Sequence, residues 1–376
     1  MRIQLAYRTD ERQLVRIRIK KCSTISSTVS EALLSTLTFK EITKMQKAIF
    51  KGITGAAASL AFMLAQPASA LNIALTNDDG WSTYGIHALF NALTAAGHNV
   101  TLAGPLSGQS GSSAALDLDA ILGRSLIIGK QAEDIYSVAT SEGSAEPATA
   151  AAIATNISSA SNSAPPDLLI SGINDGANVG AATQISGTVG ATIISIGKVI
   201  GASIPAIAIS TDERCEEGTS AEDQVVPNPA DIPDDCKEVA DFIVDLVDEL
   251  EMLPHYKNGK SGILPAGMAL NINYPPEAPL GVKLANQGRL PYIAQLGGAA
   301  SLEIACYACD KIPVGANSPG GIAGITPLSE ADVKGSDSDL FAQGYITIVP
   351  VEADYTANPN ASKGFLGTLN KFIQKQ

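Results

Sequence analysis

The chain has 376 residues, 45% of them hydrophobic, so it can bury the core of one large domain or two smaller ones and is not a disordered chain. From Leu71 onward it carries 14 Lys and Arg residues against 34 Asp and Glu residues, a formal charge of −20. A field of that sign repels a nucleic-acid duplex, whereas a small anionic substrate needs a cation or an array of backbone N–H groups to reverse the local potential.

The first 70 residues do not have the composition of a globular domain. Residues 1–44 are basic and contain no long apolar stretch, so we expect an N-terminal extension or an over-extended start, with Met45 as the alternative first residue. Residues 45–70 predict a secretory signal peptide, in which an apolar segment precedes the cleavage site Ala68-Ser69-Ala70. Because that segment is shorter than the ~20 residues of a membrane span, we expect a periplasmic or secreted protein without a stable membrane anchor.

After the signal, the chain opens with a strand, a helix and a second strand. Residues 71–77 (LNIALTN) are a short apolar run that predicts a buried parallel strand. Residues 85–96 place apolar side chains at helical spacing and stop at Gly97, a residue that favours helix ends. Residues 99–105 (NVTLAGP) predict the second strand, which completes a right-handed βαβ unit.

The pattern then repeats and predicts a Rossmann-like, doubly wound, mainly parallel α/β sheet. The expected segments are a Ser/Gly loop (107–115), an Ala-rich helix (about 146–157), a linker (158–166), a strand (167–171), a Gly/Asn loop (172–188), a helix (189 to about 200) and a closing strand (205–210). Open sheets of this kind bind ligands at the carboxyl ends of their strands, where three of the polar loops lie.

The remainder of the chain predicts an extension of this core. The expected segments are an acidic, Pro-rich surface loop (211–236), an amphipathic helix (237–253), two strands (268–275 and 344–351) and a short C-terminal helix (363–376). We therefore expect a Rossmann-like core over about residues 71–212 and a C-terminal extension, with a β-hairpin and helices, over about residues 237–376.

Four cysteines follow the signal peptide, which in an exported chain suggests two disulfides. We expect Cys215 to pair with Cys236 and Cys306 to pair with Cys309, although four cysteines allow three connectivities. A zinc site is the alternative, but one CxxC pair and three histidines are a poor ligand set for zinc.

Two adjacent carboxylates, Asp78 and Asp79, come where the first strand breaks into a turn at Gly80. Neighbouring side chains can converge at such a turn, and two like charges held close together favour a cation between them. The alternative is structural: Asp78 caps the next helix, and Asp79 bonds to its own turn.

Polar loops after two other strands carry groups that suit a phosphate or a hard cation. The loop 107–113 offers serine hydroxyls and glycines that let a ligand approach the backbone. Asn174 and Asn178 supply carbonyl oxygens or amide donors, and Ser186-Gly187-Thr188 lies where a helix begins. Each loop alone is consistent with a linker or ordinary capping, but three of them at one sheet edge predict a site.

The motifs LTNDDG, PLSGQSGSS, SGINDGANVG with ISGTVGA, LNINYP and DSDLFAQGYITIVP resemble the SurE family of survival-protein nucleotidases, over most of residues 71–356. The resemblance implies a Rossmann-like domain whose C-terminal extension exchanges a hairpin or tail between subunits, as a homodimer or tetramer. It also implies hydrolysis of a small phosphorylated substrate, a nucleoside 5′- or 3′-monophosphate, with Mg²⁺ or Mn²⁺ as cofactor.

The resemblance extends to individual positions. It implies one metal ion held by four residues: Asp78, Asp79, Ser110 and Asn174. It implies a phosphate pocket lined by six residues: Asn77, Gly111, Asn178, Ser186, Gly187 and Thr188. One of the two acids would orient or deprotonate the attacking water. The chain departs from the family pattern at residues 81–84 and at Ile185, which puts its nucleotide preference in doubt.

Three other functions fit parts of the sequence. A secreted acid phosphatase of broad specificity would have the same fold, and the export signal and the 211–236 loop favour it. A non-catalytic periplasmic module would bind a phosphorylated ligand without turnover. A Rossmann dehydrogenase is disfavoured because the first turn, NDDGWSTYG, lacks the G-x-G-x-x-G motif.

Overall fold

The computed structural model describes residues 70–123, 125–201, 203–212, 214–215, 224–252, 263–265, 267–289 and 333–354. The expected signal peptide, the Cys306–Cys309 pair and the C-terminal helix lie outside these residues. Within them, no helix is long and apolar enough to cross a membrane.

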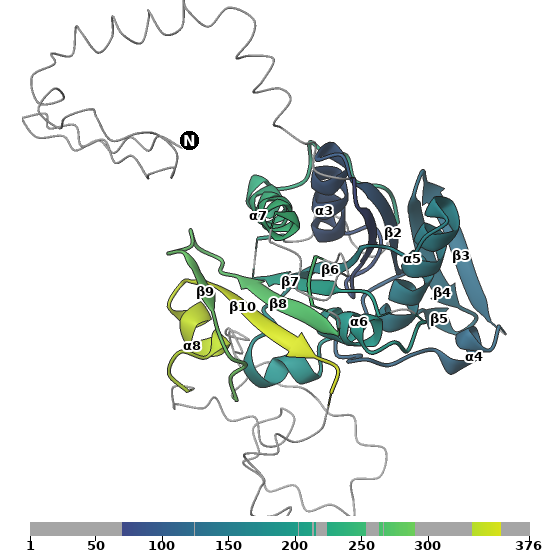
Figure 1. Cartoon of the computed structure of the whole chain (residues 1–376). Coiled ribbons are helices and arrows are strands. Elements are labelled where there is room, and N and C mark those ends of the chain that lie inside the picture. Colours follow the sequence, from purple (N-terminus) through teal and green to yellow (C-terminus); the bar gives the residue numbers. More distant parts are fainter. Residues whose placement is uncertain are drawn as a thin grey trace, which may run out of the picture. The chain divides into compact units, whose positions relative to one another are not determined.

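The described residues form one ten-stranded sheet with helices on both faces (Figure 1). The strands are β1 (Asn72–Thr76), β2 (Asn99–Pro105), β3 (Leu126–Ala132), β4 (Ile135–Thr140), β5 (Gly143–Ser144), β6 (Leu168–Asp175), β7 (Ala206–Thr211), β8 (Met268–Tyr274), β9 (Val282–Leu284) and β10 (Ile346–Glu352). The helices are α3 (Tyr84–Ala95), α4 (Leu118–Ile121), α5 (Pro147–Asn162), the 3₁₀ helix η2 (Gly180–Gln184), α6 (Gly187–Ile196), α7 (Asp234–Glu251) and α8 (Asp337–Ala342).

The strand order is β3-β4-β2-β1-β6-β7-β8-β10-β9, with β5 beside β4. Neighbours from β4 to β8 run parallel, whereas β3 and β5 are antiparallel to β4, and β10 to β8. The expected doubly wound, mainly parallel sheet is thus confirmed. The chain proceeds outward from β1 to β2 and β4, then returns through α5 to β6 and continues in the other direction. The carboxyl ends of β1 and β6 are therefore the switch point at which such sheets bind ligands.

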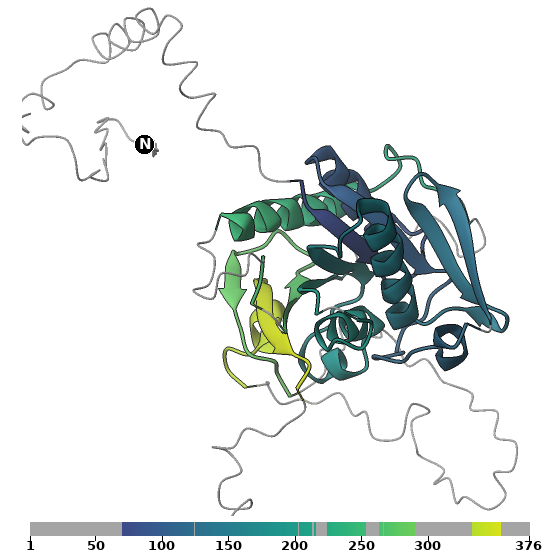
Figure 2. The same ribbon diagram turned by 45° about the vertical axis from the view of Figure 1, so that its right-hand side comes forward.

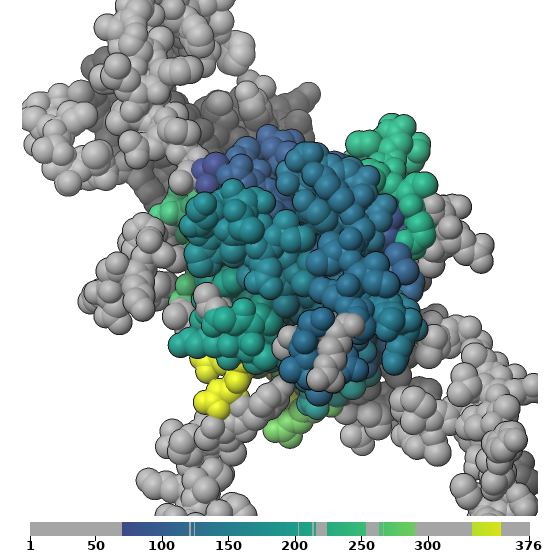
Figure 3. Space-filling model, turned by 90° about the vertical axis from the view of Figure 1, so that its right-hand side faces the viewer, coloured from purple at the N-terminus to yellow at the C-terminus, as the bar shows by residue number. Residues whose placement is uncertain are grey.

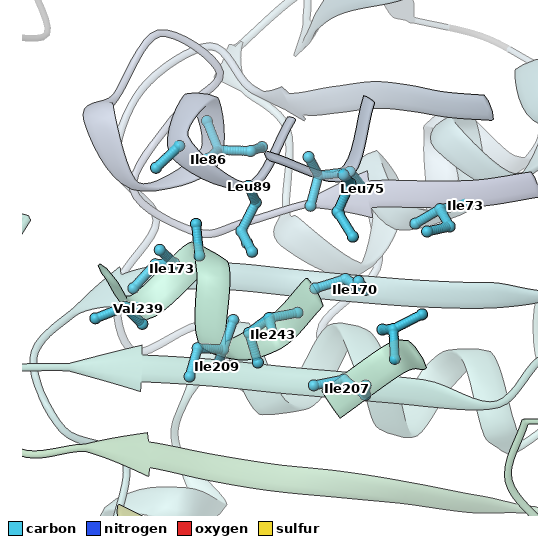
Figure 4. Close-up of a cluster of buried hydrophobic side chains, with 14 of the residues drawn as sticks. Ile73, Leu75, Ile86, Leu89, Ile170, Ile173, Ile207, Ile209, Val239 and Ile243 are labelled. Carbon is cyan, nitrogen blue, oxygen red and sulfur yellow. The ribbon is translucent and has the colours of Figure 1, made fainter. Parts of the chain in front are cut away.

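The core has two layers because the central strands are apolar on both faces. On one face, branched side chains of β1, β6 and β7 pack against α3 and α7, as Figure 4 shows for Leu75, Ile170 and Ile243. On the other face, alanines of α5 and the sheet form a second cluster that lets α5 approach closely. Figure 2 shows α7 and α5 on opposite faces, and the segments from β3 to α5 make up much of the surface in Figure 3.

The helix α5 is longer than expected and occupies most of the segment 158–166, which the sequence predicts as a linker. Its polar residues stay helical because they bond within the helix. Ser159 Oγ donates to Thr155 O at 2.7 Å, and Asn162 Nδ2 donates to Ser158 O at 2.9 Å. The helix ends at Ser163, which adopts the left-handed conformation (φ 55°).

The parallel sheet also extends further than the sequence suggests. β6 continues past Ser171 to Asp175, where Asn174 and Asp175 pair with β7 beyond a bulge. The strand 205–210 does not close the sheet, because β8 pairs with β7 in parallel over six residue pairs, from Ala206 with Ala269 to Thr211 with Tyr274. These additions place the ends of β6 and β8 beside one another across β7.

The disulfide Cys215–Cys236 is present, as expected from the cysteine spacing. It joins the segment after β7 to the first turn of α7, and both cysteines are buried. Their sulfur atoms are therefore not zinc ligands. The expected apolar face of α7 does pack on the core: Val239 and Ile243 are buried, and Phe242, Leu246 and Leu250 are partly buried against them.

Candidate active site at the switch point of the sheet

The turn that carries the two acids is shaped by Asn77, directly after β1. Its Oδ1 accepts a hydrogen bond from Gly80 N at 3.3 Å, and its Nδ2 donates to Gly80 O at 2.8 Å and to Thr83 Oγ1 at 3.1 Å. The turn lies flat against β2, where a Cβ on Gly104 would be 2.8 Å from Trp81 Cα. Asn77, expected in the phosphate pocket, thus has both ends of its amide engaged in the turn.

Asp78 is 3% exposed and is held by the start of α6. Thr188 Oγ1 donates to Asp78 Oδ1 at 2.5 Å. Burial raises the pKa of the Asp78 carboxyl, while the Thr188 hydroxyl and the backbone N–H groups of Thr188, Asp78 and Gly187 act in the opposite direction. The N-cap residue of α3 is Thr83, so Asp78 does not cap the helix that follows it.

Asp79 is half-buried and points to a different loop. Its Oδ2 accepts a hydrogen bond from Asp175 N at the end of β6, at 3.1 Å. Asn174, which precedes Asp175, donates through Nδ2 to Gly176 O at 2.6 Å. The group that Asn174 can offer a cation is therefore its carbonyl oxygen Oδ1. The structure therefore joins the acid turn to the SGIN segment, as the sequence predicts.

The serine loop after β2 is tied to the acid turn and to the residue just before the N-cap of α6. Gln109 N donates to Asp78 O at 2.7 Å, and Ser113 N donates to Ile185 O at 3.0 Å. A Cβ on Gly190 of α6 would lie 1.8 Å from Ser113 O, so the loop rests directly on that helix. Ser110 and Gly111 lie on the exposed part of this loop, next to Gln109.

The residues expected at the phosphate are partly engaged elsewhere. Ser186 is the N-cap of α6, and its Oγ accepts a hydrogen bond from Val189 N at 3.1 Å. Gly187 touches the Asp78 side chain so closely that a Cβ there would be 2.9 Å from Asp78 Oδ2. Gly187 and Thr188 hold Asp78 in place, and the capping alternative holds for the Ser186 hydroxyl.

Asn178 is the centre of a buried network that the sequence did not predict. Its N–H donates to Asn273 Oδ1 at 2.7 Å, and its carbonyl oxygen accepts from Asn271 Nδ2 at 2.9 Å. Its Nδ2 donates to Ser210 Oγ at 2.8 Å and reaches Thr188 Oγ1 at 3.4 Å. The available signal was the polar residues at alternate positions of the otherwise apolar strand MALNINY.

These groups suit a hard divalent cation. The described residues contain no cluster of three or more His, Cys, Asp and Glu side chains, so an ion here would rely on two carboxylates, an amide oxygen and a hydroxyl. Oxygen donors of this kind are the ligands of Mg²⁺ and Mn²⁺. A buried carboxyl with a raised pKa also favours a cation beside it, since the ion stabilises the charged form.

The family model described as survival protein SurE matches residues 73–293. The chain belongs to the SurE family. A 5′-nucleotidase SurE of Nostoc sp. is 31% identical over 226 residues, which is 59% of this chain and 72% of that protein. Proteins of the same name from Maridesulfovibrio salexigens (27% identical) and Picosynechococcus sp. (30%) align over 76% of this chain and over 94% and 92% of their own lengths.

The SurE fold is also found among solved structures. The SurE protein from Aquifex aeolicus aligns with 78% of this chain and 97% of its own, with a TM-score of 0.50 and 24% sequence identity. This similarity supports the Rossmann-like sheet.

A second unpredicted residue of this SurE chain is Asp337, at the start of the DSDLF motif. It is buried, and its carboxylate accepts hydrogen bonds from Gly180 N at 3.1 Å and from Gly288 N at 2.6 Å. Gly180 follows Asn178 by two residues, so Asp337 holds the same loop from the other side. The C-terminal motif thus supports the site although it lies far away in the sequence.

Proposed function

We propose that this chain is a divalent-metal-dependent phosphomonoesterase whose substrates are nucleoside 5′- and 3′-monophosphates. The proposal is supported by the curated relatives, which carry the name 5′-nucleotidase. Its main structural support is the pair Asp78 and Asp79 at the switch point, where each carboxylate is fixed by a different loop. We assign the binding of one Mg²⁺ or Mn²⁺ ion to four residues: Asp78, Asp79, Ser110 and Asn174.

When bound, such an ion would polarise a phosphate oxygen and lower the pKa of a water molecule. The two acids have different tasks in the proposed reaction. Asp78 is fixed in place because the Thr188 hydroxyl and the N–H groups of the turn and of the start of α6 hold its carboxyl. Asp79, which is more accessible, orients or deprotonates the attacking water.

The phosphate would be bound between the serine loop and the start of α6. The glycines of that loop, among them Gly111 (φ 84°), allow close approach to backbone N–H groups. Ser186 can still donate its hydroxyl proton, because its bond to Val189 N uses only a lone pair. Donors placed in this way stabilise the charge that develops during phosphoryl transfer.

The test is Asp79→Asn, with Asp167→Asn as the matched control. Asp167 also accepts a backbone hydrogen bond, from Asn72 N at 2.9 Å, but precedes β6 at the opposite edge of the sheet. We expect Asp79→Asn to unfold at the wild-type temperature and to lose at least about a hundredfold of its metal-dependent p-nitrophenyl phosphate hydrolysis, the contribution typical of a general base. Wild-type turnover in Asp79→Asn, or an equal loss in the control, would contradict the assignment.

A substrate panel separates this proposal from its alternatives. Nucleotides, sugar phosphates and polyphosphate are each tested with Mg²⁺, with Mn²⁺ and with a chelator. Preference for nucleoside monophosphates supports the nucleotidase, and equal rates on all monoesters indicate a broad phosphatase. Tight binding of a phosphorylated ligand without turnover at any metal concentration would indicate a binding module.

Export and self-association are part of the same proposal. The disulfide Cys215–Cys236 supports an oxidising compartment, because cytosolic thiols are kept reduced. Cell fractionation and the length of the mature chain test export. Sedimentation of the purified protein tests whether it is a homodimer or a tetramer.

A further inference from the structure

A glutamine from the disulfide-linked segment bonds beside two of the three loops of the proposed metal site. Gln224 Oε1 accepts a hydrogen bond from Trp81 Nε1 at 2.6 Å, and Gln224 Nε2 donates to Leu106 O at 2.8 Å. Building on the proposed function, we infer that Gln224 is a positioning residue that sets the acid turn against the serine loop, and that the Cys215–Cys236 disulfide holds it there.

Trp81 is the contact on the acid-turn side. It follows Gly80 directly and is 1% exposed. Its N–H donates to Pro105 O at 2.9 Å, and its carbonyl oxygen pairs with His87 Nε2 at 3.0 Å. With its indole N–H bonded to Gln224, the residue is fixed at three points. Movement of Gln224 is therefore transmitted to the turn that carries Asp79.

Leu106 is the contact on the serine-loop side. It lies directly after β2, and its N–H donates to Val138 O at 2.9 Å. The next residue, Ser107, donates its N–H to Ser144 Oγ at 3.0 Å. Gln224 thus binds the last carbonyl before the loop that carries Ser110. One amide group spans the ends of β1 and β2.

Glutamine is the side chain that these two contacts require, because its amide offers an acceptor and a donor on one rigid plane. Glutamate keeps the acceptor for Trp81 but places a carboxylate oxygen against Leu106 O. Leucine removes both contacts and leaves the buried indole N–H without a partner. Comparing the two variants therefore separates the effect of the bond to Leu106 from the effect of the bond to Trp81.

The backbone conformation of Gln224 indicates that contacts elsewhere in the segment fix the position of this residue. Gln224 adopts a left-handed conformation (φ 37°), which is uncommon for a residue with a side chain. The segment containing it is closed by the disulfide between Cys215 and Cys236, whose residues are buried against the core. Arg214 adds bonds to Pro275 O at 2.7 Å and to Glu238 at 3.1 Å, which fix the start of the segment.

The single tryptophan of the chain makes the link directly measurable, because Trp81 is its only source of tryptophan fluorescence. We expect acrylamide to quench Trp81 weakly in the wild type and in Gln224→Glu, and strongly in Gln224→Leu. In calorimetric titrations with Mn²⁺ alone, we expect affinity to fall about tenfold in Gln224→Leu, as for the loss of one or two hydrogen bonds. Gln224→Glu loses the Leu106 contact and is expected to bind Mn²⁺ with intermediate affinity.

Gln131→Leu is the matched control, because Gln131 Nε2 donates to Ser137 Oγ at 2.9 Å in the β3–β4 pair. It loses a comparable bond, and we expect wild-type Mn²⁺ affinity and quenching. The variant Cys215→Ala/Cys236→Ala is expected to show the quenching of Gln224→Leu.

Three results would overturn the inference. One is wild-type Mn²⁺ affinity in Gln224→Leu, a second is equal weakening in Gln131→Leu, and the third is protected Trp81 in both Gln224→Leu and the cysteine variant. If the wild-type chain itself binds no Mn²⁺, the proposed metal site fails and the inference fails with it, which is a different and recognisable outcome.

Discussion

Replacing Thr188 by Val removes the hydroxyl that donates to Asp78 while keeping the shape of the side chain. Asp78 is buried, and the contact is 2.5 Å long, so the carboxylate cannot exchange this donor for bulk water. A hydrogen bond to a charged group contributes about 1.5–3 kcal/mol. The backbone N–H groups of Gly187 and Thr188 still act on the carboxylate, and Asn178 Nδ2 keeps its bond to Ser210. We therefore expect the variant to lose about 2 kcal/mol of unfolding free energy at pH 7 in chelator.

The loss should depend on pH in a defined direction. Burial already raises the pKa of Asp78 above its usual value, so its charged form is disfavoured in the folded chain relative to the unfolded chain. Removing the Thr188 hydroxyl disfavours the charged form further and raises the pKa again. The deficit of the variant relative to the wild type is therefore full above the pKa of Asp78 in the folded variant, shrinks as the pH falls below it, and is gone below the pKa of Asp78 in the folded wild type.

Urea unfolding followed by the emission of Trp81 measures this difference, with Thr188→Ser as the control that keeps the hydroxyl. We expect Thr188→Ser to stay closer to the wild type than Thr188→Val at pH 7. A Thr188→Val variant as stable as Thr188→Ser at pH 7, or one whose deficit is unchanged at acidic pH, would refute the view that this hydroxyl stabilises a charged, buried Asp78.

Two further predictions concern residues that support the site. Burial lowers the pKa of His87 to about 4, so between pH 6.5 and pH 4 the imidazole is protonated in the unfolded chain but still largely neutral in the folded chain. The wild type should therefore lose about 3 kcal/mol of unfolding free energy over this pH range. His87→Gln keeps a donor for Trp81 O and should lack this loss in urea titrations at the two pH values. Asn273→Leu removes the acceptor of Asn178 N, which should cost about 2 kcal/mol in unfolding and lower metal-dependent kcat/KM, whereas unchanged values of both would contradict its role.

Most of the sheet could be predicted from the sequence because its central strands are apolar on both faces. Residues 99–105 match β2 at both ends, and residues 268–275 differ from β8 by one residue. The prediction was wrong where polar residues had internal partners. The serines and asparagine at the end of α5 suggested a linker, yet they bond to helix carbonyls that lie four residues earlier in the chain.

The sequence could predict which loops lie together at the candidate site, but not which hydrogen bonds their residues form. Parallel strands bring their carboxyl ends to one edge, so placing Asp78, Asp79 and Asn174 near each other needed only the strand positions. The bond between Thr188 and Asp78 depends on how α6 is set over the sheet, and no local pattern encodes that. For the same reason, the motifs LNINYP and DSDLFAQGYITIVP contain Asn273 and Asp337 but did not indicate the contacts that these two residues make at the site.

The contacts that sequence patterns missed explain how a strongly negative chain can keep two acids side by side. Asn77 fixes the turn, Thr188 fixes Asp78, and Asp175 N fixes Asp79. These donors act in the folded chain before any ligand arrives, so the carboxylates are already oriented and a cation need not reorganise them. An ion bound as proposed would add its own stabilisation, which grows with its free concentration, to a site whose geometry the fold has already set.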